Sequence, residues 1–385
     1  MARTTNTPDV VVAGGGVIGL AIAWESAVRG LSVVVADPHS ARGASWAAAG
    51  MLAPVTEVHY GEERLLELNL ESHALYPGWA AELNEASGRD CGYAETGTLV
   101  VARDADDNSA LNQLFDFQQS LGLEVERLRG RECRQIEPAL APSTRGGILS
   151  RGDHQVDNRA LLEALLTACE RAGVRTVDRP VARVDLASGR VAGVSLDGGE
   201  RVSCPTVVIA AGAHSARIEG LSPEMVPPVR PVKGQLLHLR GASKERLAPR
   251  TIRGLDAYIV VRPDGRIVLG ATVEEQGFDE RVTAGGIYEL LRAGFELVPG
   301  IAELELVETS VGLRPGSPDN APMLGPTSVE GLVLATGHYR NGILLAPLTG
   351  GAIAELLSTG ESPDLIKPFS PQRFSNRSIA TGAGL

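Results

Sequence analysis

One stretch near the start of the chain, residues 9 to 46, restricts the fold more than any other. It holds an apolar run, the turn GGGVIG at residues 14 to 19, a segment with helical spacing, and a second apolar run. Gly14 permits a tight turn, Gly16 lets a pyrophosphate approach the backbone, and Gly19 lets the helix pack close to the strand. The helix N-terminus presents free N–H groups to phosphates. The stretch therefore predicts a βαβ unit that binds an adenine dinucleotide.

An acidic residue at the right distance strengthens this prediction. Asp37 lies 23 residues after Gly14, at the expected end of the second strand. Its carboxylate is placed to accept both ribose hydroxyls and would repel a 2′-phosphate, which disfavours NADP. The alternative is a Gly-rich turn that binds nothing, and the register of strand, helix, strand and acid argues against it. The motif alone does not separate NAD from FAD.

Length and composition limit the remaining possibilities. A chain of 385 residues is expected to form two domains. The net charge of −11 argues against nucleic acid and anionic membrane surfaces as partners. No apolar stretch is long enough to span a membrane, and residues 1 to 8 lack the apolar core of a secretory signal. Four scattered cysteines without a C-x-x-C pair indicate neither a metal site nor a redox dithiol. We therefore expect a cytoplasmic protein with no membrane partner.

Segments of dinucleotide-domain character are interleaved with antiparallel ones. The first kind occupies residues 1–90, 153–220 and 325–370, and the second kind fills 91–152 and 221–324. This predicts an α/β fold with a discontinuous Rossmann-like domain and an α+β substrate domain whose mixed sheet is largely antiparallel. NAD dehydrogenases usually keep the cofactor domain contiguous, so the interleaving favours a flavoprotein.

Local signals predict several elements. A helix is expected over residues 62–87, with a break at Pro77. Asp157 or Asn158 is the expected N-cap of a helix over 159–172, and Asp264-Gly265 indicates a hairpin. The tail after Pro368 is expected at the surface or in disorder.

Four further motifs connect the chain to a family. They are AAAGML at residues 47–52, PVKGQ at 231–235, GLRPG at 312–316 and GHYRNGIL at 337–344. With them the chain resembles the D-amino-acid oxidase superfamily of FAD enzymes, and within it the bacterial glycine oxidases of thiamine biosynthesis, from Val10 to about Leu357. The resemblance implies FAD as cofactor, O2 as electron acceptor and a homo-oligomer, specifically a homotetramer. No cysteine lies between residues 305 and 345, where some sarcosine-oxidase relatives attach their flavin, so the FAD is expected to be non-covalent.

The resemblance also implies which residues contact FAD. The ADP half would lie along Val17, Ile18, Asp37 and Pro38, and Val181 would meet the adenine through its backbone. The further residues expected to bind the cofactor are Gly14, Gly16, Gly19 and Gly212. The ribityl chain and flavin would lie along Ala44, Ser45, Ala49, Gly50 and Met51. The strand-to-helix turn of His338, Tyr339, Arg340, Asn341, Gly342, Ile343 and Leu344 would wrap the isoalloxazine, where a helix N-terminus stabilises the anion of reduced flavin.

For the substrate, the resemblance implies that Arg314 binds the carboxylate, that Tyr258 donates a hydrogen bond to it, and that Arg340 lies near substrate and flavin. A planar guanidinium matches a carboxylate with two parallel N–H bonds. The structural alternatives are a buried ion pair for Arg314, a loop salt bridge for Arg340 and an ordinary half-buried sheet residue for Tyr258. His338 is expected to contact flavin through its backbone and not to act as a base.

The chain departs from the glycine oxidase pattern at two pocket positions. Asp256 stands where that pattern has His, and Val273 stands where it has Met. Asp256 and Met51 are expected to line the substrate pocket, where the Asp256 carboxylate would attract a substrate ammonium.

The function that follows is FAD-dependent oxidative deamination of glycine and other small amines. Hydride would pass from Cα to flavin N5, and O2 would reoxidise the flavin to give hydrogen peroxide. The imine would feed thiamine thiazole synthesis. The alternatives are a D-amino-acid or sarcosine-type oxidase or dehydrogenase, or a flavin-binding subunit without turnover.

Overall fold

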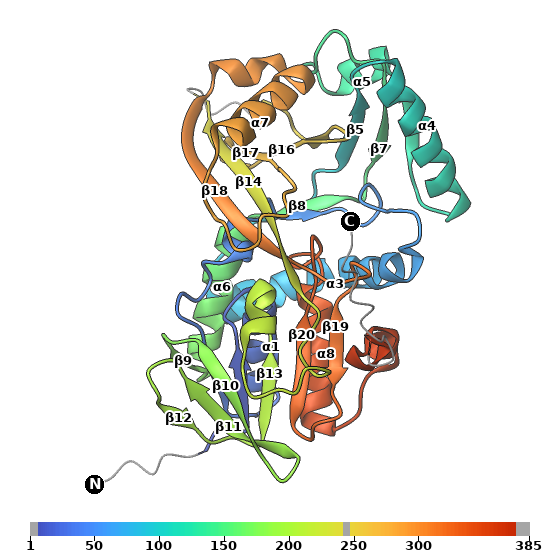
Figure 1. Ribbon diagram of the computed structural model, residues 1–385. Helices are drawn as coiled ribbons and strands as arrows, with labels where there is room; N and C mark the ends of the chain where they lie inside the picture. Colours follow the sequence, from blue (N-terminus) through green and yellow to red (C-terminus); the bar gives the residue numbers. More distant parts are fainter. Residues whose placement is uncertain (1–6, 242–246, 375–385) are drawn as a thin grey trace, which may run out of the picture.

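The computed structural model describes residues 7–241 and 247–374, and two large sheets organise them (Figure 1). One is a six-stranded sheet in the order β19-β20-β13-β1-β2-β9, parallel except for the β19–β20 pair. In that order its strands span Met323–Pro326, Leu332–Thr336, Thr206–Ile209, Val10–Ala13, Val33–Ala36 and Arg175–Val177. The expected α/β class with a Rossmann-like sheet is confirmed.

The first strand and helix form where the Gly-rich turn predicts them. All four residues of β1 are buried, and the strand pairs in parallel with both β13 and β2. A continuous valine run suits such a central strand because both of its faces are covered. Helix α1 (Val17–Val28), packed against α8 (Ala346–Thr359), covers one face of the six-stranded sheet. The small antiparallel sheet of β10, β11 and β12 covers the other face. These three strands span Val181–Ala187, Arg190–Leu196 and Arg201–Val202.

Three more helices complete the core around α1: α3 (Glu63–Ser87), α6 (Asn158–Arg171) and α8 (Ala346–Thr359). Asp157 is the N-cap of α6, as predicted, and its carboxylate accepts hydrogen bonds from Arg159 N and Ala160 N. The expected break at Pro77 is wrong, because α3 continues through it. Pro77 is exposed between the buried Tyr76 and Trp79. Buried anchors on both sides of Pro77 therefore hold the helix together despite the missing N–H donor.

The second large sheet has eight strands in the order β18-β14-β17-β16-β15-β5-β7-β6. In that order they span Glu305–Gly316, Arg230–Arg240, Arg266–Gly270, Tyr258–Val261, Thr251–Arg253, Thr98–Ala102, Gly146–Ser150 and Glu126–Arg129. Only the β15–β5 pair is parallel. The sheet is therefore mixed and largely antiparallel, as expected. The Asp264-Gly265 hairpin forms, with Gly265 at φ +84°.

The two faces of this sheet have different roles. Side chains such as Ile259 and Leu269 pack beneath α7 (Ala284–Leu297). The alternate residues Tyr258 and Val260 face the segment of residues 47–51 instead. The period of two along β16 therefore puts Tyr258 on the side of the cavity described below.

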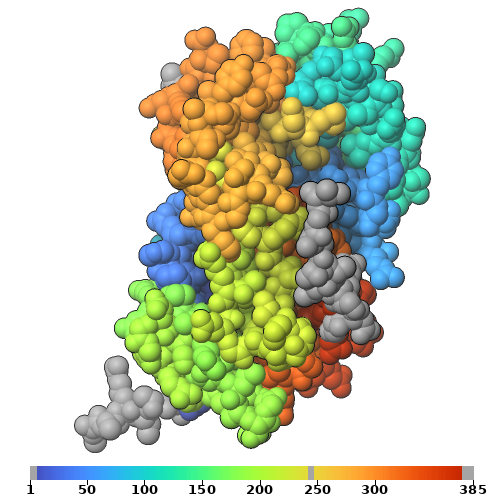
Figure 2. Space-filling view, in the orientation of Figure 1, coloured from blue at the N-terminus to red at the C-terminus, as the bar shows by residue number. Residues whose placement is uncertain are grey.

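The remaining elements pack on these layers or connect them. They are α2 (Ala44–Ala47), β3 (Met51–Leu52), β4 (Tyr93–Ala94), α4 (Ala105–Ser120), α5 (Gly130–Ile136), β8 (His154–Val156) and the 3₁₀ turns η1 (Gly212–Arg217), η2 (Pro299–Glu303), η3 (Asp364–Phe369) and η4 (Pro371–Phe374). The space-filling view shows segments far apart in sequence meeting in each half, with green and red chain in the lower half and cyan and orange chain in the upper (Figure 2).

The end of the chain is more ordered than predicted up to residue 374. Phe369 is buried, and Arg373 forms an ion pair with Asp319. The predicted surface tail therefore packs on the molecule through η4, because an aromatic ring and a guanidinium both find partners there. Two terminal segments lie outside the described residues. They are residues 1–6, which form part of the segment assessed for a secretory signal, and residues 375–385. Within the described chain, no helix combines the length and the apolar character needed to cross a bilayer.

Candidate active site

A cavity of about 840 Å³ lies where the two sheets meet. It is bounded by the β1–α1 turn, the end of β2, residues 42–51, and parts of β16, β18 and the β20–α8 turn. All but three of the site residues predicted from the sequence line it. The exceptions are Gly19, beneath the turn, and Asn341 and Leu344, both buried in the β20–α8 turn.

The Gly-rich turn forms an open cradle at the N-terminus of α1. Gly14 has φ +114°, and a Cβ on it would lie 2.5 Å from the Ala210 carbonyl oxygen. A Cβ on Gly19 would lie 1.9 Å from the Gly14 carbonyl oxygen, so only glycine allows this packing. The N-cap residue Gly16 offers no side-chain cap, and the first turn holds no acidic residue. The positive end of the helix is therefore accessible to an anion in the cavity.

Asp37 stands beside this cradle, immediately after β2. Its Oδ2 accepts a hydrogen bond from Gly15 N (2.8 Å), and its Oδ1 accepts one from His39 N (2.8 Å). These bonds fix the carboxylate at the cavity wall while leaving lone pairs for further donors. The arrangement fits the adenosine end of a dinucleotide.

Residues 44–51 form the next part of the wall and are held from behind. Asn158 donates to the carbonyl oxygens of Ser45 (2.9 Å) and Trp46 (2.8 Å). Arg262 donates to the carbonyl oxygen of Ala49 (2.7 Å). Small side chains in this segment leave room for a flat, bulky group in the cavity.

Arg314 and Tyr258 come together at one side of the cavity. Arg314 Nη1 donates to the carbonyl oxygens of Thr272 (3.1 Å) and Lys233 (3.3 Å). No carboxylate within the described residues forms an ion pair with it, so the predicted alternative of a buried ion pair is not observed. Burial raises the pKa of Tyr258, whereas the neighbouring Arg314 lowers it.

Two glycines make room for this pair. A Cβ on Gly234 would lie 2.4 Å from the Arg314 guanidinium, and a Cβ on Gly270 would lie 2.7 Å from the Tyr258 ring. Gly234 in the motif at 231–235 and Gly270 in the strand before residue 271 therefore contribute to the site because they have no side chain.

Two other predicted residues are engaged by partners distant in the sequence. Arg340 forms an ion pair with Glu62, the structural alternative considered for it, although it also lines the cavity. Asp256 forms an ion pair with Arg103 (3.1 Å) and is 48% exposed. Its negative charge is therefore partly balanced before any substrate ammonium arrives.

His338 is buried, and its Nε2 lies 3.1 Å from Thr349 Oγ1. Burial lowers the pKa of His338 to about 3, so the ring is neutral near pH 7. Its backbone carbonyl oxygen accepts from Asn341 N, which closes the β20–α8 turn. These contacts favour a structural role for the imidazole and argue against a general base.

The sequence reasoning missed several polar residues of the cavity. Glu57 and Arg253 form an ion pair there (3.4 Å), and His59, His214 and Arg217 also line it. They come from β15, from η1 and from the loop before α3, and none of them stands in a motif with recognisable spacing. Only the fold brings them to the cavity.

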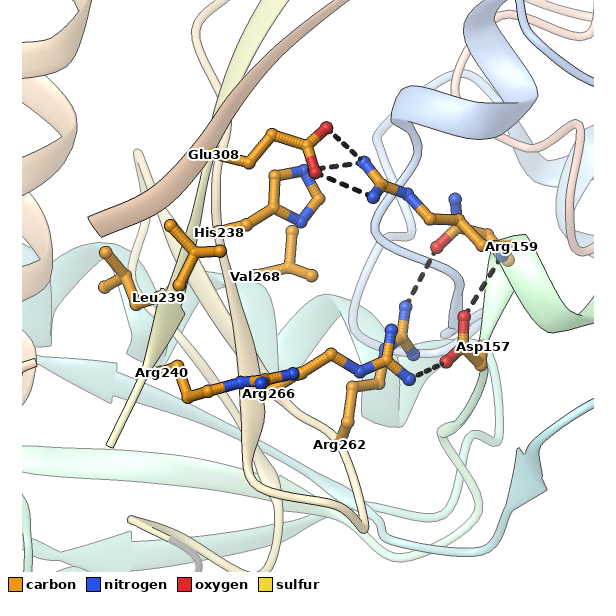
Figure 3. A pocket seen from close by; sticks show the side chains of 11 residues that line it. Asp157, Arg159, His238, Leu239, Arg240, Arg262, Arg266, Val268 and Glu308 are labelled. Atoms are coloured by element: carbon orange, nitrogen blue, oxygen red, sulfur yellow. Dashed lines mark hydrogen bonds and ion pairs between the residues drawn. The ribbon is translucent and has the colours of Figure 1, made fainter. Parts of the chain in front are cut away.

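A second, smaller cavity of about 220 Å³ is lined by Asn158 and Arg262, the residues that hold the segment 44–51 from behind (Figure 3). Arg159 makes a bidentate contact with Glu308 (2.7 and 2.8 Å), and Arg266 bonds to Asp157. Because these charged groups already have partners, we interpret this region as a junction between α6 and the eight-stranded sheet.

The large cavity therefore combines a cradle for a dinucleotide with a side pocket for a carboxylate. FAD fits its chemistry: glycines for the pyrophosphate, an acid for the ribose, a small-residue wall for the flavin, and a guanidinium beyond it. Arg314 and Tyr258 lie together at one side of this cavity, and FAD when bound would supply the redox chemistry.

Comparisons with known proteins agree with this geometry. The family model for FAD dependent oxidoreductases, DAO, matches residues 9–356. The bifunctional protein ThiO/ThiG of Trichormus variabilis is 35% identical over 388 residues, covering 97% of this chain and 56% of that protein. The chain thus spans about half the length of such bifunctional relatives.

Relatives of similar length are also found. The glycine oxidase of Geobacillus kaustophilus is 37% identical over 372 residues, covering 96% of this chain and 98% of that protein. A crystal structure of glycine oxidase from the same organism has a TM-score of 0.88 and covers 95% of this chain and 98% of its own.

Proposed function

This chain belongs to the family of FAD-dependent oxidoreductases, and from that premise we propose that it oxidises glycine and other small amines that carry a carboxylate. The observation that carries the proposal is Arg314, a guanidinium without a carboxylate partner in the described residues, beside Tyr258 in the cavity. Such a group favours a substrate with a carboxylate. The names of the relatives, ThiO/ThiG and glycine oxidase, point to glycine and to a role in thiamine synthesis.

The chain's residues would act by orientation and charge. Arg314 would bind the substrate carboxylate through two N–H groups, and the Tyr258 hydroxyl would donate to the same carboxylate. When bound beside them, FAD would supply the redox chemistry, which is acceptance of a hydride from the substrate Cα and reoxidation by O2 to give hydrogen peroxide. We assign no residue as a base, since His338 is neutral and bonded to Thr349. The substrate would react as its free amine, and the imine would be hydrolysed or used for thiazole synthesis.

Substitution of Arg314 tests this assignment. We expect Arg314→Gln to lower kcat/KM for glycine by about 10² to 10⁴, because a charge-assisted bidentate bond is worth about 3–5 kcal/mol when its loss leaves a buried charge unpaired. Peroxide release should be measured with glycine and with glycinamide, which lacks the carboxylate. The proposal requires a large loss with glycine and a small one with glycinamide. Equal losses with both would contradict it.

The alternative substrates remain sarcosine and small D-amino acids. Asp256 and Val273, the two departures from the glycine oxidase pattern, both line the cavity and favour a test of these amines. If sarcosine or D-proline gives a higher kcat/KM than glycine, the family assignment stands and the preferred amine changes. We also propose a cytoplasmic location, which four free cysteines support, and a homotetrameric assembly.

A further inference from the structure

We propose that Arg262 is a positioning residue whose buried charge makes the protein bind reduced FAD more tightly than oxidised FAD. The inference rests on the proposed placement of the flavin against residues 44–51. It concerns a residue outside the lining of the large cavity, with no assigned part in substrate binding.

Arg262 is an unusually placed cation. It is 2% exposed and follows β16 at the start of the Asp264-Gly265 turn. Its guanidinium donates to four oxygen atoms, all neutral: Gln155 Oε1 (2.9 Å), Val156 O (2.7 Å), Ala49 O (2.7 Å) and Asn158 Oδ1 (3.1 Å). Among the described residues no carboxylate lies within 4.0 Å of its nitrogens. The hydrogen bonds are satisfied, but the charge has no counter-ion in contact.

Only backbone separates this charge from the large cavity. Ala49 and Gly50 both line the cavity. Gly50 has φ +74°, and a Cβ on it would lie 3.1 Å from Arg262 Nη2 and 2.0 Å from the Val156 carbonyl oxygen. The guanidinium therefore lies directly behind this part of the wall.

The neighbouring carboxylates do not line the large cavity. Asp157 and Asp264 are both bonded to Arg266, and Figure 3 shows the contact with Asp157. Burial lowers the pKa of Arg262 to about 10, which still leaves the group protonated at neutral pH. Arg262 is thus the cation that lies against residues 49–50, whereas the carboxylates of Asp157 and Asp264 are bonded to Arg266 and do not line the large cavity.

A fixed positive charge here has a thermodynamic consequence. Reduction adds electrons to bound FAD, and negative charge in a water-poor site is stabilised by a nearby cation. The preference of the protein for reduced FAD over oxidised FAD should therefore be larger with this charge than without it. The midpoint potential of bound FAD measures that difference directly.

The test uses the FAD-loaded protein and three variants. Arg262→Gln removes the charge, and Arg262→Lys keeps it while losing part of the hydrogen-bond fork. Arg240→Gln, in the same sheet, removes an exposed cation that lines the junction cavity and serves as the matched control. Midpoint potentials are measured by equilibrium reduction against a reference dye, and the dissociation constant of oxidised FAD is measured in parallel.

We expect Arg262→Gln to weaken binding of reduced relative to oxidised FAD on the order of tenfold, a shift of about −30 mV for a two-electron couple. Arg262→Lys and Arg240→Gln should keep the wild-type potential. An unchanged potential in Arg262→Gln, or an equal shift in Arg262→Lys, would overturn the proposal and leave Arg262 as a structural link.

If Arg262→Gln fails to retain FAD, the lysine variant decides. A wild-type midpoint potential in Arg262→Lys supports the role of the charge, and a midpoint potential shifted by about 30 mV contradicts it. The readout does not depend on any amine. Failure of the proposed glycine oxidation would appear as absence of turnover, whereas failure of this inference would appear only in the potentials.

Discussion

At the scale of single residues, buried polar groups hold the loops that surround the cavity. Asp153 is fully buried and accepts hydrogen bonds from Val55 N (3.2 Å), Thr56 N (2.7 Å) and Thr56 Oγ1 (2.6 Å). It thereby fixes the start of the segment that carries Glu57 into the cavity. Burial raises the pKa of Asp153 to about 6, whereas the Thr56 hydrogen bonds lower it.

This raised pKa predicts a pH dependence of stability. Between pH 3.8 and 6 the folded protein keeps a proton on Asp153 that the unfolded chain loses, so folding becomes less favourable as pH rises. Relative to Asp153→Asn, the wild-type free energy of unfolding should fall by about 2 kcal/mol from pH 4 to pH 6.5 and then level off. Urea unfolding of both proteins across this range measures it. A difference that stays constant would refute the assignment.

Residue types in the cavity were predictable only where a motif carried them. The Gly-rich turn, Asp37 and the 312–316 motif marked positions that the structure brings to one cavity. The partners of Arg340 and Asp256 were not predictable, because Glu62 and Arg103 lie 278 and 153 residues away. Ion pairs of this kind are created by the fold and leave no local pattern.

At the scale of elements, the contact between α1 and α8 holds the cradle in place. Gly350 of α8 packs against α1: a Cβ on it would lie 3.1 Å from Ala21 Cβ and 3.2 Å from the Ala21 carbonyl oxygen. The adjacent Gly351 has open space around its missing Cβ. Two neighbouring glycines in one helix thus face different surroundings.

This difference predicts opposite effects of the same substitution. Gly351→Ala should raise the free energy of unfolding by about 0.5–1 kcal/mol, because alanine favours the helix. Gly350→Ala should lower it by about 1–3 kcal/mol, because backbone atoms of α1 cannot easily yield. Thermal unfolding of the two variants compares them directly. Equal effects would show that the α1–α8 contact is looser than described.

Elements with an apolar run, a clear period or a turn signal were predictable, and elements without one were not. The α6 helix and its Asp157 cap follow from apolar spacing and a polar residue before it. Helix α3 differs at Pro77 because tertiary anchors outweigh a local helix-breaking signal. The strand β7 and helix α5 were not predicted, because each is short and lacks a clear period. The parallel β5–β15 pairing joins strands far apart in the chain, which local patterns cannot reveal.

At the scale of the molecule, the cavity lies between the two large sheets, so FAD should bind to both. A ligand that binds only the folded state stabilises it by mass action. With free FAD at about a thousand times its dissociation constant, the free energy of unfolding should rise by about 4 kcal/mol over the FAD-free protein. Thermal scans with and without FAD measure this. Identical midpoints would mean that FAD does not contribute to joining the two sheets.

The α/β class and the mixed second sheet followed from the sequence, because interleaved blocks of two characters are visible in it. The division at residues 90, 153, 220 and 325 stays a prediction about domain boundaries. The relative placement of the sheets was beyond the sequence, since it depends on buried links such as Arg262 and Asn158 between distant segments.

The central claim is that glycine reduces FAD held in this cavity. The most direct measurement is anaerobic mixing of the FAD-loaded protein with glycine while the flavin absorbance near ~450 nm is followed. We predict that this band is lost with glycine and returns when air is admitted, with hydrogen peroxide released. A band that persists with glycine, sarcosine and D-proline alike would contradict the account and indicate a flavin-binding subunit without turnover.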